Sequence, residues 1–118
     1  MTDDVERHLP LKPVDLQLML ALAEGELHGY GLVQAIEAGT DGLVRLDPGN
    51  LYRVIKRLLA AGLLDEADRR TAADLGDERR RYYALTPLGQ RVLAAELHRL
   101  DAMMRSRQVR SIVRQGAS

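Results

Sequence analysis

Residues 47–62 hold the sequence feature that most constrains the fold, an amphipathic helix whose start and end are both marked. Asp47 can cap the free N–H groups of a helix, and Pro48 suits the first helical position, where its missing N–H costs nothing. Apolar residues then recur at i, i+3, i+4, i+7 and i+8, which is the spacing of one helical face: Leu51, Val54, Ile55, Leu58 and Leu59. Gly62 ends the pattern. One side of this helix must therefore lie on a hydrophobic core, while the other faces outward.

Patterns before this helix predict two more helices and a short strand. Residues 1–12 are expected to form an irregular arm. A helix beginning at Pro13 carries an apolar stripe wide enough to be buried on most sides, and a second helix is predicted over residues 29–38. Residues 43–46 are short, extended and rich in β-formers, which predicts a brief strand.

Patterns after the helix predict a hairpin and a long helix. Residues 63–68 and 80–85 are extended candidates joined by a polar loop, and alternation along the second strand predicts that one of its two tyrosines packs inward. Thr86-Pro87 repeats the cap-plus-proline signal, and we predict an unbroken helix from there to about Val113, ~40 Å long. The predicted fold is mainly α with a small β-wing: an arm (1–12), a winged helix-turn-helix domain (13–86), and a long C-terminal helix with a short tail (87–118).

The residue inventory excludes several function classes. The chain has 118 residues and no cysteine, which removes disulfides, thiolate metal sites and thiol catalysis and fits a reducing cytoplasm. The three histidines lack partners at metal-ligand spacing, and no nucleophile–base set stands out, so we expect no metal, no cofactor and no enzyme activity. The longest run without polar side chains, residues 58–64, is far too short to span a bilayer. We therefore expect a cytoplasmic protein.

The formal net charge of zero conceals a segregated distribution. The 17 basic and 17 acidic residues cancel over the whole chain. Residues 48–64 nevertheless carry three basic residues and no acidic one, and residues 79–118 carry nine basic and two acidic residues. Neutrality therefore does not exclude DNA as a partner, and it predicts a localised positive face.

Three motifs occur in order and at fitting distances along the chain. They are His28-Gly29-Tyr30; residues 47–64, from Asp47-Pro48-Gly49-Asn50-Leu51-Tyr52-Arg53 through Lys56-Arg57-Leu58 to Gly62-Leu63-Leu64; and Arg80-Arg81-Tyr82-Tyr83-Ala84-Leu85-Thr86-Pro87-Leu88-Gly89. Together they resemble the PadR family of bacterial transcriptional regulators, in its shorter form with one C-terminal dimerisation helix. Asp47 and Asn50 stand where the family often has Ser or Thr. The resemblance implies a homodimeric repressor that binds a palindromic operator in double-stranded DNA.

The exposed face of the helix from Pro48 is the predicted DNA-reading surface. Arginine can bond guanine and asparagine can bond adenine in bidentate fashion. The predicted contacts on this helix are Asn50, Tyr52, Arg53, Lys56 and Arg57. On the wing, the candidates are Arg79, Arg80 and Arg81, and at least one of the three is predicted to contact the DNA backbone. The alternatives are a solvated basic helix in which Asn50 serves only the cap, and an edge strand whose charges block unwanted pairing.

The long C-terminal helix is predicted to hold a homodimer together. Its apolar seam alternates at 4-3-4 spacing and consists of Leu93, Leu97, Leu100 and Met104. A domain of this size can bury only one face of such a helix, and a two-fold partner is the simplest cover, although the helix could also fold back on its own domain. The resemblance also implies a small hydrophobic or aromatic effector near the dimer interface. Met19, Met103 and Met104 are the candidate lining, with plain core packing as the alternative.

Two other functions fit the same elements. A winged-helix adaptor for protein–protein contact would suit a neutral chain, but it would not need basic residues concentrated on the third helix and the wing. A regulator of another winged-helix family is disfavoured by the His28-Gly29-Tyr30 motif and by the Tyr82-Tyr83 strand.

Overall fold

Helices α2 (Pro13–Ala21), α3 (Gly29–Gly39) and α4 (Pro48–Ala60) surround a common hydrophobic core in the computed structural model, which describes residues 3–69 and 80–116. The innermost side chains come from all three helices and are at most 2% exposed: Leu18, Met19, Leu32, Ile36 and Ile55. The three helices predicted from the sequence are confirmed. Because α2 contributes side chains to the core along much of its length, its sequence shows a broad apolar stripe rather than a narrow one.

Helix α4 begins and ends as the sequence predicts. The Asp47 carboxylate accepts a hydrogen bond from the backbone N–H of Asn50 at 2.9 Å, which satisfies one of the free donors of the first turn. The apolar side chains of α4 that enter the core are Leu51, Ile55 and Leu58. After the last turn, Gly62 has a φ of +78°, a conformation that glycine adopts without steric cost.

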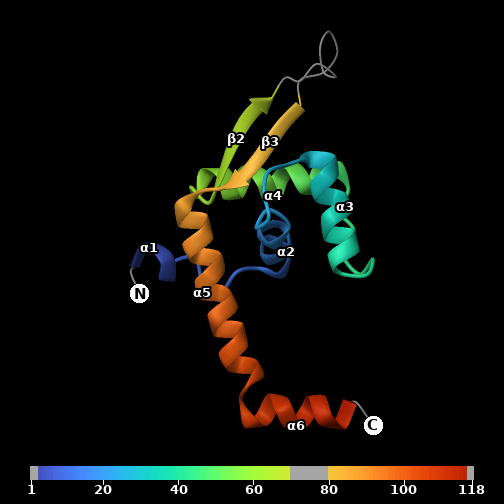
Figure 1. Cartoon of the computed structure of the whole chain (residues 1–118), viewed down its shortest axis with the longest axis vertical. Coiled ribbons are helices and arrows are strands. Elements are labelled where there is room, and N and C mark those ends of the chain that lie inside the picture. Colours follow the sequence, from blue (N-terminus) through green and yellow to red (C-terminus); the bar gives the residue numbers. More distant parts are fainter. Residues whose placement is uncertain (1–2, 70–79, 117–118) are drawn as a thin grey trace.

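A three-stranded antiparallel sheet forms the wing. Strands β2 (Leu64–Arg69) and β3 (Arg80–Leu85) confirm the predicted hairpin, and β1 (Leu27–His28) pairs with the other edge of β3. Tyr83 is 2% exposed, so the prediction of one inward tyrosine is confirmed. The neighbouring Tyr82 ring meets His28 of β1 edge-on at 5.5 Å between centroids. In Figure 1 the hairpin projects from the helical domain, and α4 crosses beneath it.

The predicted strand at residues 43–46 is wrong. Leu43 and Arg45 are exposed and Val44 and Leu46 partly buried, and the segment pairs with no strand among the described residues. The sheet of β1, β3 and β2 does not include it. The backbone N–H of Val44 instead donates to the Thr40 hydroxyl at 3.0 Å.

The predicted single C-terminal helix is also wrong, because it is broken into two. Helix α5 (Pro87–Met104) is followed by a bend at Arg105 and Ser106, and α6 (Arg107–Gly116) leaves at a steep angle (Figure 1). The Ser106 hydroxyl accepts from the backbone N–H of Val109 at 3.3 Å, so serine acts here as the cap of a new helix. No residue of α6 is buried.

The N-terminal arm is more ordered than predicted. It contains a short helix, α1 (Asp3–Glu6), whose Val5 is 4% exposed and belongs to the core. Helix α1 packs against α5, and Arg91 of α5 bonds Asp4 at 3.1 Å. This order comes from contact with a residue 87 positions further along the chain, so the local sequence contains no sign of it.

Glu96 ties the end of the arm to α5. Its carboxylate is 1% exposed, accepts from the backbone N–H of Leu11 at 3.0 Å and pairs with Arg99 at 2.6 Å. The hydrogen bond from Arg99 lowers the pKa of Glu96 below its ordinary value, the Leu11 N–H lowers it further, and burial opposes both. The buried carboxylate is therefore held in its charged form.

The junction between the wing and α5 is tightly packed. The Thr86 hydroxyl donates to the carbonyl of Gly62 at 2.7 Å and accepts from the backbone N–H of Gly89 at 2.9 Å. The first turn of α5 lies so close to the chain after α4 that a Cβ at Gly89 would overlap the Leu63 carbonyl oxygen. This contact fixes how α5 leaves the domain.

Candidate nucleic-acid interface

The outer face of α4 presents two cations one helical turn apart. Arg53 and Lys56 are both exposed, and neither forms an ion pair or hydrogen bond within residues 3–69 and 80–116. Tyr52, beside them, is 54% exposed. Since Leu51, Ile55 and Leu58 fix the opposite face in the core, these side chains must point away from the domain. The result is a rigid helix with long donors free to meet an anionic partner.

Asn50 lies at the start of the same helix but is engaged in the cap. Its backbone N–H donates to one oxygen of Asp47 at 2.9 Å, and its side-chain amide donates to the other at 3.0 Å. The amide would have to leave Asp47 before it could form a bidentate bond with adenine. This geometry favours the capping role that the sequence left open.

Arg57 is separated from the other basic side chains of α4 by its contacts. Its guanidinium forms a bidentate pair with Asp15 of α2 at 2.6 and 2.8 Å. The Asp15 side chain is 6% exposed and that of Arg57 is 43% exposed. The hydrogen bond with Asp15 raises the pKa of Arg57 above its ordinary value. Arg57 was predicted as a DNA contact, and the structure gives it the additional role of fixing α4 against α2.

Loss of the Arg57–Asp15 pair should lower the stability of the protein, whereas loss of Arg53 should not. We expect Arg57→Ala to lower the free energy of unfolding by about 2 kcal/mol, because it leaves the buried Asp15 carboxylate without a partner. Arg53→Ala, on the same helix, should change it by less than about 0.5 kcal/mol. Urea unfolding followed by circular dichroism measures both.

A double variant provides the control for this prediction. Asp15→Leu with Arg57→Met replaces the pair by apolar groups of similar size and should recover most of the lost stability. Equal unfolding midpoints for Arg57→Ala and Arg53→Ala would show that the pair does not hold α4.

The wing contributes one described basic side chain of the three predicted. Arg81 on β3 is exposed and bonds Glu66 of β2 at 3.2 Å across the hairpin. Its attraction for phosphate is therefore partly offset by a carboxylate on the neighbouring strand. Arg79 and the side chain of Arg80 lie outside the described part of the protein.

Tyr30 is a candidate contact that the sequence analysis did not single out. It stands in the first turn of α3, and 69% of it is exposed. The adjacent His28 caps the same helix, since its Nδ1 accepts from the backbone N–H of Gly31 at 2.9 Å. In helix-turn-helix proteins the first helix of the motif crosses the DNA backbone, and a phenol there can bond a phosphate. The sequence signal for Tyr30 is the His28-Gly29-Tyr30 motif, which the sequence analysis used only for the family resemblance.

The residues of the predicted dimer seam lie in different environments. Leu93 is 5% exposed and belongs to the core of its own domain. At this residue the helix therefore packs on its own domain, which was the alternative to contact with a second subunit. Leu100 is partly buried, whereas Leu97 and Met104 are 39% and 51% exposed. Leu93 is thus unavailable to a partner, whereas Leu97, Leu100 and Met104 can contact another molecule.

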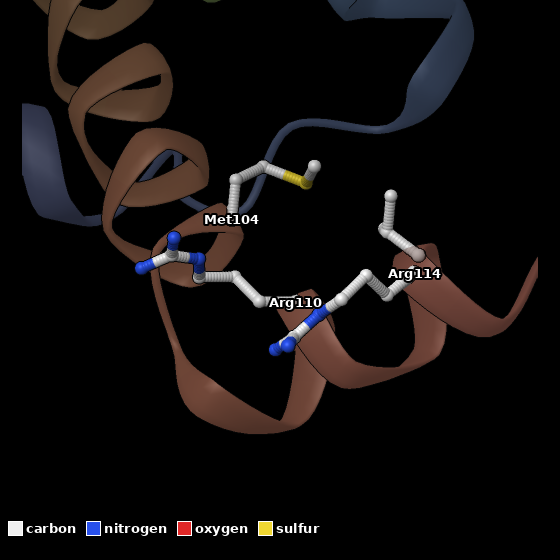
Figure 2. Close-up of a pocket in the computed structure, with 4 residues that line it drawn as sticks. Met104, Arg110 and Arg114 are labelled. Atoms are coloured by element: carbon white, nitrogen blue, oxygen red, sulfur yellow. The ribbon is translucent and has the colours of Figure 1, made fainter. Parts of the chain in front are cut away.

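The three methionines proposed for an effector pocket are also separated. Met19 is fully buried in the core, while Met103 and Met104 are exposed at the end of α5. A hollow of about 500 Å³ is lined by Met104, Arg110, Val113 and Arg114. Figure 2 shows Met104 at the end of α5 and Arg110 and Arg114 on α6. Met19 is not part of this lining.

The described residues contain neither a metal-ligand cluster nor a membrane-spanning helix. Among the described residues, no three His, Cys, Asp or Glu side chains are close enough together to hold a metal ion. No helix in residues 3–69 and 80–116 combines the length and apolarity needed to cross a membrane.

Three helices share one core, the last of them, α4, exposes a basic face, and a β-wing follows it. Together these elements define a winged helix-turn-helix protein. Residues 18–95 match the model of the transcriptional regulator PadR-like family. The chain belongs to this family, so the predicted resemblance is confirmed, and its class is that of transcriptional regulators rather than enzymes.

Similar proteins include one sequence relative and several solved structures. A 37.1 kDa protein in transposon TN4556 of Streptomyces fradiae is 40% identical over 86 residues, which are 71% of this chain and 22% of that protein. The chain thus spans about a fifth of the length of this relative. Bacillus subtilis PadR in complex with operator DNA aligns with a TM-score of 0.64 at 19% identity, over 75% of this chain and 48% of that one. A PadR family regulator from Clostridium difficile gives 0.66 at 18% identity, over 91% and 100%. At these identities the structures show a shared fold.

Proposed function

We propose that the protein is a homodimeric repressor that binds a palindromic operator through helix α4. The observation that carries this proposal is the pair Arg53 and Lys56, exposed and without partners in the described chain, on a helix held rigidly by its apolar face. In each subunit α4 would enter a major groove, and the two helices would lie about one turn of DNA apart, ~34 Å. The operator complex of the B. subtilis relative supports the same use of the fold.

Fewer residues are proposed to contact DNA than the sequence alone suggested. Arg53 and Lys56 are the base- or phosphate-reading residues of this proposal, and Tyr52 and Tyr30 lie where they can contact the backbone. Arg57 and Asn50 act mainly on the position and start of α4. Release by a small hydrophobic or aromatic effector, which the family resemblance implies, would involve the exposed Met103 and Met104 rather than the buried Met19. A protein with this proposed function would act in the cytoplasm.

A salt titration tests DNA binding by the whole protein. The probe is duplex DNA from directly upstream of the protein's own gene, and the control is a scrambled duplex of equal length. If the dimer neutralises about six phosphates, its affinity should fall by about 1,000-fold between 50 and 200 mM salt, because bound counterions are released on association. An affinity that stays flat over this range would contradict the proposal. No binding to either duplex at low salt would favour the adaptor function.

A further inference from the structure

A pocket of about 260 Å³ lies between the N-terminal arm and the end of α4. Its walls come from three parts of the chain that are far apart in sequence: the arm, the first turn of α2, and the end of α4 with the residues after it. The lining belongs to residues 8–12, Asp15 and residues 57–63. The outward cations of α4 and the exposed methionines of α5 do not line this pocket. It is therefore separate from the surfaces described above.

The polar part of this pocket has an excess of positive charge. Lys12 is exposed, and its ammonium forms no ion pair or hydrogen bond with the described residues. Arg57 donates to Asp15 at 2.6 and 2.8 Å, but a guanidinium carries more N–H donors than these two, and 43% of the Arg57 side chain is exposed. Asp15 is the one acidic residue among the described lining residues, and Arg57 already neutralises it; His8 is the remaining titratable group. The pocket thus favours an anion.

The rest of the lining is aliphatic. It consists of Pro10 and Leu11 from the arm and of Leu58, Ala61 and Leu63 from the end of α4 and the chain after it. Leu58 and Leu63 are each 2% exposed and belong to the core, which holds these walls in place. A cavity of about 150 Å³ is enough to hold benzene. The pocket therefore has room for an anion that carries a short hydrocarbon body.

A ligand in this pocket would connect several elements of the fold. It would contact the arm, α2 and α4 at the same time. The arm is in turn tied to α5, because the backbone N–H of Leu11 donates to the Glu96 carboxylate at 3.0 Å. These segments come together only in the folded chain, so the ligand would bind the folded state alone and raise the thermal midpoint of the protein.

We infer that this pocket binds a small aliphatic carboxylate. The carboxylate group accepts from the Lys12 ammonium and from the N–H groups of Arg57 that Asp15 does not use, and the hydrocarbon body lies against the leucines of the lining. Asp15 keeps its bonds to Arg57, so the ligand adds contacts to the pair instead of breaking it. The inference goes beyond the proposed operator binding and does not depend on it.

Isothermal titration calorimetry of the full chain with sodium hexanoate tests this inference. Hexanoate should bind with a dissociation constant of about 1 mM or less. Each buried methylene strengthens binding by about fourfold, so butyrate should bind about 15-fold more weakly. Hexanamide, which has the same size but no charge, should bind at least about tenfold more weakly than hexanoate.

Three results of these titrations would overturn the inference. Equal affinities for butyrate and hexanoate would show an anion bound without the apolar walls. Equal affinities for hexanoate and hexanamide would show that the cations play no part. The third is an absence of both heat and a rise in thermal midpoint at a hexanoate concentration of about 10 mM, tenfold above the expected dissociation constant.

Two matched lysine variants locate the site. Lys12→Met removes the proposed ammonium contact and should weaken hexanoate binding by about tenfold. Lys56→Met removes the same charge from the outer face of α4 and should bind hexanoate as the unchanged protein does. Ala61→Leu places a larger side chain in the pocket and should weaken binding by at least about tenfold. All three positions are exposed, so the thermal midpoints without ligand should stay close to that of the unchanged protein.

The outcomes separate this inference from the proposed function. Equal losses of hexanoate affinity in the two lysine variants would overturn the site, as would full affinity in a folded Ala61→Leu protein. No DNA is present in these titrations. Failure of the unchanged protein to bind its upstream DNA would therefore overturn only the operator-binding proposal.

Discussion

Replacing both Arg53 and Lys56 by alanine is expected to abolish specific operator binding while leaving the fold intact. The two side chains are exposed on α4 and form no ion pair or hydrogen bond with the described part of the domain, so their loss should remove interactions with DNA and little else. Each good contact with a base or phosphate contributes about 1–3 kcal/mol, and a dimer loses four of them. The affinity should fall by at least about 100-fold, to the level of binding to unrelated DNA.

The matched control for this prediction removes two cations from another helix. Arg91→Ala with Arg105→Ala changes the net charge by the same amount, but both positions lie on or at the end of α5 and pair with aspartates of their own chain. Gel-shift titration at one fixed salt concentration compares the variants, and circular dichroism verifies their helix content. If both double variants lose the same affinity, the effect is one of total charge, and Arg53 and Lys56 are not the reading residues.

Gly89→Ala is expected to be the most destabilising glycine-to-alanine substitution among the described residues. The added methyl group would overlap the backbone carbonyl of Leu63, which cannot move without breaking the bond it accepts from the N–H of Thr86 at 3.1 Å. Overpacking against backbone should cost more than about 3 kcal/mol, enough to unfold much of the protein at about 37 °C. A urea titration or a thermal melt would show this as a large loss of stability.

Gly39→Ala provides the comparison for the same change of residue. Gly39 ends α3, and a Cβ there would have nothing within 4 Å. Alanine is the better helix former, so this variant should be unchanged or more stable by up to about 1 kcal/mol. A Gly89→Ala protein as stable as Gly39→Ala would show that the junction between the wing and α5 is looser than the structure indicates.

The elements that the sequence predicted correctly are those with local signals. Helix α4 has a cap, a proline, an apolar stripe and a terminal glycine between Asp47 and Gly62, and the hairpin strands alternate around a polar loop. The elements that were missed depend on distant partners. Strand β1 is two residues long and exists because Tyr82 and Tyr83 pair with it from far along the chain. Residues 43–46 lie outside the sheet, and the backbone N–H of Val44 bonds the Thr40 hydroxyl instead.

The candidate site shows the same division. The basic outer face of α4 could be predicted from helical periodicity, because burial of one face determines the other. The separate role of Arg57 could not, since it depends on Asp15, 42 positions earlier. The bend before α6 was equally hidden: Arg105 and Ser106 are neither glycine nor proline, and a serine inside a helical pattern becomes a cap only when the chain turns there.

The buried face of α4 has a consequence for how such a protein could acquire a new target sequence. Each residue added to a helix rotates the rest of that helix by about 100°. An insertion or deletion between Leu51 and Leu58 would therefore take the residues on its two sides out of register, so that Leu51, Ile55 and Leu58 could no longer share one buried face. If α4 reads the operator as proposed, altered base preference should arise by substitutions at its outward positions, and designed variants with new operators should be sought by exchanging those side chains within a helix of constant length.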